Sequence, residues 1–426
     1  MIDSKALYRK FIGAAGLQIV CRGLSVVSGI ILARYLGPEQ YGLYSFVLSI
    51  VTIAMMVVVA GLPLLLIREV ANLELDKLWA DLKGIIYWSS LSVLVFSVAV
   101  ISVFLVMLFM ESFDIATSSL LWFAIVLIPI KSYSSIQGAI LNGFRKPILA
   151  LIPESILMPS AALLFYGVYI HLNIKFTALL LIQTQLVTAI VACLSATVLI
   201  KKIKPTQLRS INPIFNTKKW YSALLPFTIM SLLGTLNVEV SSILLGTLGT
   251  KQDVGFFKVA LQGVTLVTLG LTAINTISGP NIARLFKSGN IVETQHLLTR
   301  SVKLACMVSM PVVIFFYFWG EWVITLLFGY EYAPSSKILI VLCLGQTVNA
   351  IMGSSGLVLN MTGNESKSLR ALFATLLINT FSLAILVPIY GSTGAAVSVS
   401  ISMIFWNLLM AYEVYKITGL KTWLRF

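Results

Sequence analysis

Residues 11–33 read FIGAAGLQIVCRGLSVVSGIILA, an apolar run with a single charge, Arg22, at its centre. About 20 predominantly apolar residues are enough for a helix to cross the hydrocarbon core of a membrane. The run is longer than the apolar part of a secretory signal, and no small-residue cleavage site follows it. It therefore predicts an uncleaved membrane-spanning helix, and its central arginine must face other protein or water.

The composition of the whole chain places it in the same class. Of 426 residues, 58% are apolar and only 11% are charged, whereas soluble proteins carry about 45–50% apolar and about 25% charged residues. Two histidines and four cysteines without paired spacing predict neither a metal site nor a disulfide framework, and we expect no cofactor. A net charge of +14 in so apolar a chain indicates contact with anionic membrane lipids rather than with nucleic acid.

Further apolar windows follow along the chain, limited by Gly, Pro and clusters of charge. About twelve spans are expected, at residues 11–33, 43–66, 85–110, 118–140, 148–170, 176–200, 221–248, 255–282, 304–327, 338–359, 372–389 and 395–414. The connections between them are short, and the outer loops hold about ten residues or fewer. The fold class predicted is an all-α membrane protein without a soluble domain.

The distribution of Lys and Arg predicts the orientation. If the N-terminus is cytoplasmic, 23 of these residues lie in inner segments and 4 in outer segments. Loops rich in Lys and Arg stay on the cytoplasmic side of a membrane. We therefore expect a multi-pass protein of the bacterial inner (cytoplasmic) membrane with both termini in the cytoplasm.

The two halves of the chain resemble each other at an offset of 213 residues. This offset places the tripeptide at 42–44, Gly-Leu-Tyr, over Gly-Phe-Phe at 255–257, and Leu48, Val51 and Thr52 over Leu261, Val264 and Thr265. A duplication predicts two six-helix bundles, residues 1–200 and 221–426, joined by a basic cytoplasmic linker at 201–220. Two such bundles in the same orientation imply a pseudo-two-fold axis along the membrane normal and a central cavity between them.

Arg22 is the leading candidate for a binding residue. It lies about 16 Å from either end of its span, too far for its side chain to reach the membrane surface comfortably. Gln18, Ser25 and Gly29 share its helical face, so this polar and small-residue face can line a cavity. A structural ion pair or a hydrogen-bonded packing site is the alternative.

A longer polar stripe is predicted on the eighth span. It comprises Lys258, Gln262, Thr265, Thr268, Thr272 and Asn275, spaced three or four residues apart. Glu239 in the seventh span could be the counter-ion of Lys258 or of Arg22, or a site for a coupling ion. Lys131 and Glu154 are further charged residues within spans, and a structural role is the alternative for each.

Three cations within the spans predict a site for an anion. Arginine offers a planar fork and lysine a point charge, and both suit a phosphate or pyrophosphate group. Arg22, Lys131 and Lys258, with Gln18, Gln262 and Thr265, are therefore the predicted substrate-binding residues, and Glu239 and Glu154 the predicted coupling or ion-pair residues. No catalytic residue is predicted.

The chain also resembles a known family at motifs in order along nearly its whole length. These are LARYLGPEQYGLY at 32–44, GLP at 61–63 with Arg68-Glu69, GFRK at 143–146, LLFGY at 326–330 with Tyr332, and GLVLNMTG at 356–363. They are similar to the polysaccharide-transport family, the Wzx-type O-antigen or lipid-linked oligosaccharide flippases of the multidrug/oligosaccharidyl-lipid/polysaccharide exporter superfamily.

The resemblance implies two bundles around a central cavity and alternating access of a polyprenyl-pyrophosphate-linked oligosaccharide from the inner to the outer leaflet. It also implies an arginine in the first helix and other basic residues in the cavity, for which Arg22 and Lys258 are the matching positions, and an acid in the seventh helix, here Glu239. A polysaccharide polymerase and a chain-length regulator are further partners that the family implies. Twelve spans rather than fourteen argue against the lipid II flippase subtype.

Two other function classes remain open. A cation-coupled multidrug exporter of the same superfamily would favour acids over bases in its cavity, and this chain has the reverse. A membrane polysaccharide polymerase or glycosyltransferase would need a substantial outer loop with catalytic groups, and we find no paired carboxylates and no nucleophile with a base. We therefore expect a transporter rather than an enzyme.

Overall fold

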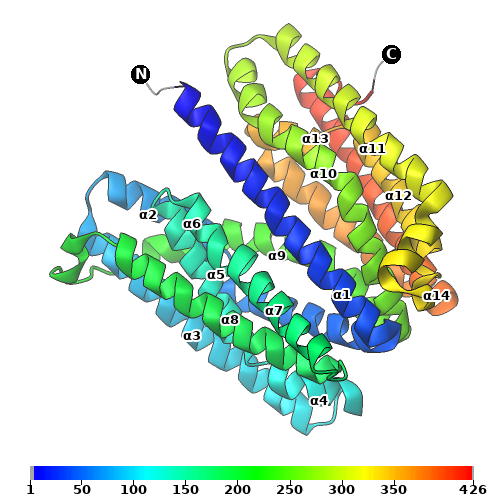
Figure 1. Cartoon of the computed structure of the whole chain (residues 1–426). Helices are drawn as coiled ribbons and strands as arrows, with labels where there is room; N and C mark the ends of the chain where they lie inside the picture. Colours follow the sequence, from blue (N-terminus) through cyan, green and yellow to red (C-terminus); the bar gives the residue numbers. More distant parts are fainter. Residues whose placement is uncertain (1–3, 425–426) are drawn as a thin grey trace. The chain divides into compact units, whose positions relative to one another are not determined.

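The computed structural model describes the backbone of residues 4–424 and the side chains of residues 20–424 except 209, 269, 270, 273, 276, 277 and 280. Within these limits the chain is a succession of helices with no β-strand (Figure 1). The α-helices are α1 (Ser4–Val59), α2 (Leu62–Leu75), α3 (Trp79–Phe109), α4 (Ile115–Ala124), α5 (Leu127–Gly143), α6 (Pro147–Leu151), α7 (Met158–His171), α8 (Ala178–Ile203), α9 (Thr217–Leu248), α10 (Lys251–Lys287), α11 (Ile291–Phe328), α12 (Ser335–Met352), α13 (Ser355–Met361) and α14 (Glu365–Thr418). A π-helical turn, Ile152–Leu157, joins α6 to α7, and short 3₁₀ turns lie at Thr206–Arg209 and Tyr330–Tyr332.

Within the described residues, eight helices are long and apolar enough to cross a membrane, or nine if α4 and α5, bent by 44°, form one broken span. Two of the eight are interrupted by a glycine. The 54 residues of α14 would extend about 80 Å as one straight helix, far more than the ~30 Å of a bilayer core. The all-α membrane fold is thus confirmed, while the count of twelve spans stays a prediction.

The two interruptions lie where loops are predicted. In α1 the break is at Gly37, with φ 71° and ψ 168°, and in α14 it is at Gly391, with φ 54° and ψ −132°. Glycine adopts positive φ without steric cost. Pro38, directly after the first break, suits the first turn of a new helix because it has no N–H to satisfy. Each long helix therefore contains two of the predicted spans.

Two other predicted spans are shorter as helices than the apolar pattern indicates. The span at 43–66 is interrupted at Ala60 and Gly61, between α1 and α2, and the span at 338–359 is interrupted at Gly353, where φ is 66°. Hydropathy does not detect these breaks because the flanking side chains remain apolar.

The chain forms two compact units. Unit 1 comprises Met1–Leu36 and Val47–Thr235, and unit 2 comprises Gly37–Phe46 and Leu236–Phe426. Helices α1 and α9 each contribute residues to both units. The short segment Gly37–Phe46 is thus packed with helices that lie more than 190 residues further along the chain.

In unit 1, the basic segment after α8 packs against the beginning of α3. The backbone N–H of Ile214 donates to the carbonyl oxygen of Ala80 at 3.1 Å, and Lys83 Nζ donates to the carbonyl oxygen of Ile211 at 2.7 Å. A Cβ atom at Gly84 would overlap the carbonyl group of Ile214, so glycine is required for this approach. The segment is therefore a fixed part of unit 1.

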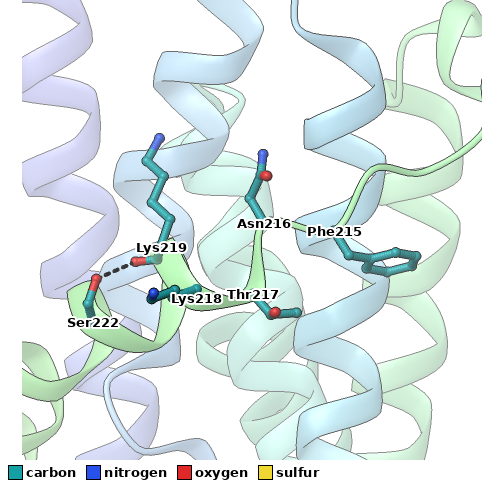
Figure 2. Close-up of a pocket in the computed structure, with 6 residues that line it drawn as sticks. All are labelled: Phe215, Asn216, Thr217, Lys218, Lys219 and Ser222. Carbon is teal, nitrogen blue, oxygen red and sulfur yellow. Dashed lines mark hydrogen bonds between the residues drawn. The ribbon is translucent and has the colours of Figure 1, made fainter.

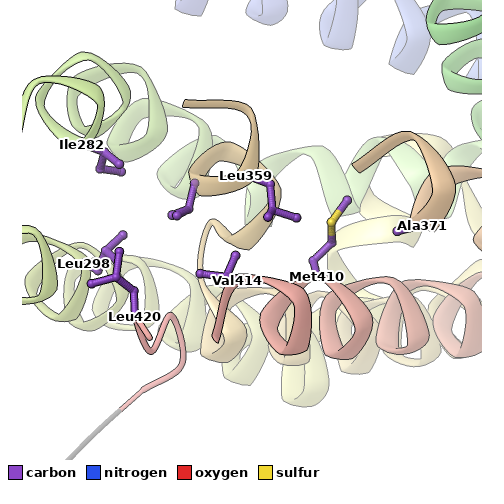
Figure 3. Packing of buried hydrophobic residues seen from close by; sticks show 8 residues of the cluster. Ile282, Leu298, Leu359, Ala371, Met410, Val414 and Leu420 are labelled. Atoms are coloured by element: carbon purple, nitrogen blue, oxygen red, sulfur yellow. The ribbon is translucent and has the colours of Figure 1, made fainter. Parts of the chain in front are cut away.

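In unit 2, the segment after α14 packs in a similar way against the beginning of α11. Gln295 exchanges two hydrogen bonds with the backbone of Lys421, at 2.7 and 2.8 Å. Leu420 is buried with Ile282, Leu298 and other apolar residues (Figure 3). In both halves, the residues after the sixth predicted span thus bind the start of the third, as a duplicated chain would produce.

Candidate functional site

The charged residues predicted in the seventh and eighth spans meet in unit 2. Lys258 Nζ lies 3.3 Å from Glu239 Oε2, and their side chains are 21% and 15% exposed. Of the three roles considered for Glu239, the geometry directly exhibits that of counter-ion to Lys258. An acid and a base on neighbouring helices neutralise each other, which lowers the cost of placing either one among apolar helices.

The same region contains polar groups with incomplete hydrogen bonding. Gln262 Nε2 donates to the hydroxyl of Tyr41 at 2.7 Å, and Asn379 Nδ2 donates to the hydroxyl of Ser241 at 3.3 Å. Among the described residues, no partner is found for the buried oxygens Gln262 Oε1, Asn379 Oδ1 and Ser242 Oγ. Buried polar atoms of this kind are normally satisfied by water or a ligand. The polar stripe is therefore a place that water can occupy.

Thr265, also predicted to bind substrate, donates its hydroxyl proton to the carbonyl oxygen of Leu261 at 3.1 Å. This local bond satisfies the hydroxyl within the helix and leaves its lone pairs available. The bond neither supports nor excludes a substrate contact, so the role of Thr265 stays a prediction.

In unit 1, Arg22 lies on α1 with a half-buried side chain. No described residue forms an ion pair or a hydrogen bond with its guanidinium group. Its neighbours on the same helix are engaged elsewhere: Ser25 Oγ donates to the carbonyl oxygen of Cys21 at 3.1 Å, and Ser28 is hydrogen-bonded to Tyr166 of α7. The side chain of Gln18, predicted to share this face, lies outside the described residues.

Lys131 and Glu154 also belong to unit 1 and interact with each other. Lys131 is half-buried on α5, and Glu154 lies in the π-helical turn before α7 with an exposed side chain. The opposite charges are close enough for electrostatic attraction. Of the three predicted cations, Lys131 and Lys258 thus each have an acid nearby, whereas Arg22 has none among the described residues.

The ion pair of unit 2 can be tested by a pair of substitutions. Glu239→Gln leaves the Lys258 charge without its acid, and we expect it to lower the free energy of unfolding by about 1–3 kcal/mol, because the pair is only partly shielded. The double variant Glu239→Gln/Lys258→Gln should recover most of this loss. Thermal unfolding in detergent measures both.

A matched control is the Lys367–Glu413 pair, at 3.5 Å with a more exposed lysine, 39%. Glu413→Gln should cost less than Glu239→Gln because water screens this pair better. Equal costs at the two positions, or a double variant no better than the single one, would contradict a coupled pair at Glu239 and Lys258.

A second cluster surrounds the segment Gly37–Phe46, which includes most of the first motif. A Cβ atom at Gly42 would overlap the carbonyl group of Lys251, and one at Gly255 would overlap that of Pro38. Both pairs join equivalent positions of the two halves, since 38 and 251, like 42 and 255, differ by 213. The contact is therefore reciprocal. It requires glycine because two helices approach each other to backbone distance.

Asp253 connects this cluster to the break in α14. Its carboxylate accepts hydrogen bonds from the backbone N–H and hydroxyl of Thr250, at 3.2 and 2.6 Å, and from those of Ser392, at 3.1 and 2.7 Å. Sequence reasoning missed this role, although the Thr250-x-x-Asp253 spacing is that of a capping box. Burial raises the pKa of Asp253, but the four hydrogen bonds outweigh it and hold the pKa below the ordinary value of 3.8.

This lowered pKa predicts a pH dependence. Because the folded state binds the Asp253 proton less tightly than the unfolded state, the stabilisation is complete above about pH 4 and is lost as the pH falls through the folded value. Asp253→Asn should therefore lower the unfolding temperature at pH 7, and the difference from the wild type should shrink below pH 3. A difference that stays constant over this range would contradict a stabilising carboxylate.

Several other motif residues have packing roles in unit 1. The carboxylate of Glu69, with only 7% of its side chain exposed, lies 2.9 Å from Arg68 and 3.8 Å from Lys219. Gly61 donates its N–H to the hydroxyl of Thr228 at 3.2 Å, and Gly143 packs against α2. These motifs therefore hold helices together and do not by themselves locate a substrate site.

The comparisons with known proteins agree with this fold. Two solved structures match nearly the whole chain: an inward-facing multidrug resistance MATE family transporter of the MOP superfamily, with 16% identity, TM-score 0.75, and 93% of this chain and 94% of that chain covered; and the lipid II flippase MurJ in an inward closed conformation, with 16% identity, TM-score 0.74, and 95% and 87% covered. At these identities the likeness shows the fold alone.

Two curated relatives match about half of the chain. One is the capsular polysaccharide biosynthesis protein CapF of Staphylococcus aureus, 30% identical over 209 residues, with 48% of this chain and 52% of the relative covered. The other is the probable low-salt glycan biosynthesis flippase Agl15 of Haloferax volcanii, 21% identical over 222 residues, with 51% and 45% covered. The chain thus matches about half the length of each relative.

The family model described as "Polysaccharide biosynthesis protein" matches residues 7–286. This range covers the first motif, Arg22 and the polar stripe of α10, and it exceeds half of the chain. With multiple apolar helices and the fold of membrane transporters, the chain is a multi-pass membrane protein, and it belongs to the polysaccharide biosynthesis protein family.

Proposed function

We propose that this protein is a flippase that moves a polyprenyl-pyrophosphate-linked oligosaccharide, an O-antigen repeat or similar unit, from the inner to the outer leaflet of the cytoplasmic membrane. Its family membership, its transporter fold and its similarity to a relative named as a glycan flippase support this function. Both termini lie in the cytoplasm in this proposal, as the distribution of Lys and Arg predicts.

The observation that carries the proposal is Arg22, a half-buried arginine in a membrane helix without an acidic partner among the described residues. An uncompensated charge in such a helix costs about 2.5–3.5 kcal/mol on insertion scales, so a protein keeps it where water or an anion meets it. A pyrophosphate group matches the fork of a guanidinium with two parallel charge-assisted hydrogen bonds.

Lys131 and Lys258 have a secondary role in this proposal. Their acids, Glu154 and Glu239, reduce the positive charge that each lysine offers to a ligand, so the anion is held first by Arg22. Gln18, Gln262 and Thr265 supply neutral hydrogen bonds to the sugars. The two lysines gain access to the substrate only when it competes with their acids.

Transport by alternating access breaks no covalent bond and therefore needs no catalytic group. Outward movement of an anion is favoured by the cell-negative membrane potential, by about 2.3 kcal/mol per charge per 100 mV. A doubly charged headgroup gains nearly twice this amount, which can drive net movement without a coupling ion. A polymerase and a chain-length regulator that use the product are partners implied by this function.

The second candidate is a cation-coupled multidrug exporter, which the structural similarity to a MATE family transporter suggests. A cationic drug would need an available acid. The acids within the spans, Glu154 and Glu239, are each close to a lysine, which makes them poor sites for a cation.

A transport assay distinguishes the two functions. The full chain is reconstituted in vesicles that contain a fluorescent polyprenyl-pyrophosphate oligosaccharide, and a membrane-impermeant reagent reports the fraction in the outer leaflet. We expect faster exchange than in protein-free vesicles, and no such effect on a polyprenol-linked sugar without phosphate. Movement of a cationic dye but not of the pyrophosphate lipid would instead identify a drug exporter.

A further inference from the structure

The segment between α8 and α9 is strongly basic. Residues 201–222 contain no acid, and the next acid along the chain is Glu239. The lysines of the segment are Lys201, Lys202, Lys204, Lys218 and Lys219. A basic loop of this kind is ordinarily a solvated signal for membrane orientation, but here the loop is folded onto a helix.

The bonds to α3 place the end of this segment in a defined position. Besides the contacts of Ile211 and Ile214 described above, the side-chain amide of Asn216 donates to the carboxylate of Asp81. Residues 211–216 are thus held at three points along the first turns of α3. The two lysines that follow, Lys218 and Lys219, begin α9 from a fixed starting point.

A cavity of about 560 Å³ opens at this position. Its lining residues are Phe215, Asn216, Thr217, Lys218, Lys219 and Ser222 (Figure 2). Lys219 and Asn216 extend in the same direction from the backbone, and Phe215 extends away from them. The lining thus combines two ammonium groups, two hydroxyls and an aromatic ring, which are groups that bind a phosphate at one end and apolar atoms at the other.

The positive charge in the cavity is only partly neutralised. Among the described residues, no acid pairs with Lys218. Lys219 is 3.8 Å from Glu69, but Arg68 lies closer to the same carboxylate, at 2.9 Å. One carboxylate therefore serves two cations, and the cavity retains a net positive charge that an anion can balance.

Exposed apolar side chains surround the cavity. Ile214 and Phe215 before α9, and Tyr221 and Leu225 in its first turns, are 52–64% exposed. Because α9 is a candidate membrane span, its first turns lie where the membrane begins, and these side chains can meet lipid tails. A soluble anion would use the lysines but would leave the apolar side chains unexplained.

We propose that Lys218 and Lys219, with the hydroxyls of Thr217 and Ser222, bind the phosphate of an anionic phospholipid of the surrounding membrane, while its acyl chains lie against Phe215 and Tyr221. Lysine near a membrane surface attracts anionic lipid, and aromatic rings favour the same interfacial depth. This site is separate from the proposed transport substrate and does not depend on it.

The test measures lipid binding to the full, delipidated protein in detergent by native mass spectrometry. The probes are phosphatidylglycerol and phosphatidylcholine with the same acyl chains. We expect the wild type to prefer phosphatidylglycerol, Lys218→Gln to weaken its binding about fivefold, and Lys218→Gln/Lys219→Gln to weaken it about 25-fold, as about fivefold per lysine predicts. Binding of phosphatidylcholine should not change.

The matched control is Lys201→Gln/Lys202→Gln, which removes the same charge from the same segment outside the cavity and should weaken binding less than about twofold. Equal losses in both double variants, equal binding of the two lipids, or displacement of phosphatidylglycerol by inorganic phosphate at equal concentration would each overturn the proposal. Lys218→Gln keeps the test valid if loss of the Lys219–Glu69 contact disturbs folding, because Lys218 is exposed.

Discussion

Replacing Gly42 with alanine is expected to prevent unit 2 from packing correctly. The added Cβ would overlap the backbone carbonyl of Lys251, and a backbone group cannot move aside as the end of a flexible side chain can. We expect a loss of about 3 kcal/mol or more, at the upper end of what single substitutions cause. The readouts are the yield of monodisperse protein and its unfolding temperature.

The reciprocal contact makes this prediction specific. Gly255→Ala should have an effect of similar size, because its Cβ would overlap the carbonyl of Pro38 in the same interface. The double variant should cost less than the two single effects together, since either substitution already separates the helices.

The control is Gly167→Ala, within α7, where an added Cβ meets no atom within 4 Å. Alanine is favoured over glycine in a helix by up to about 1 kcal/mol, so this variant should be at least as stable as the wild type. A Gly42→Ala protein as stable as Gly167→Ala would show that the two helices do not approach to backbone distance.

Replacing Arg22 with alanine is expected to reduce transport at least about 30-fold while the protein remains folded. Hydrogen bonds to charged groups contribute about 1.5–3 kcal/mol each, and a guanidinium makes two to a pyrophosphate. Removing a charge that has no described acidic partner should leave the unfolding temperature unchanged or raise it. If Arg22 were a structural ion-pair residue, the same substitution would lower the unfolding temperature.

Conservative variants separate charge from geometry. Arg22→Lys keeps the charge but not the planar fork, so we expect intermediate transport. Arg22→Gln keeps much of the size without the charge and should resemble Arg22→Ala. Transport by Arg22→Gln equal to that of the wild type would remove Arg22 from the anion site, and a lowered unfolding temperature in all three variants would assign it a structural role.

The candidate site could be predicted only in part. The sequence indicated Arg22, Lys131, Glu154, Glu239 and Lys258, because an ionisable residue in an apolar run is visible without any knowledge of the fold. It did not determine their partners, since several pairings across neighbouring helices were compatible with the same spacing. The structure brings Glu239 to Lys258 and Lys131 to Glu154, and it leaves Arg22 without a described acid.

The glycines illustrate the same limit. The offset of 213 residues placed Gly42 over Gly255, and this match was used only as a sign of duplication. In the structure the two glycines belong to one interface, where each allows the other helix to approach. A repeat in a sequence records equivalence between positions and cannot report that the equivalent positions touch.

The sequence by itself determined that this protein is a helical membrane protein, approximately where its helices lie, and that charges are placed within them. These properties depend on the apolar content of about 20 consecutive residues, so they are local. Only the tertiary structure decided that residues 37–46 pack with unit 2, that the basic segment after α8 is bound to α3, and which charges are paired. Those outcomes depend on contacts between residues that are often more than 100 positions apart, and such contacts arise only when the helices pack.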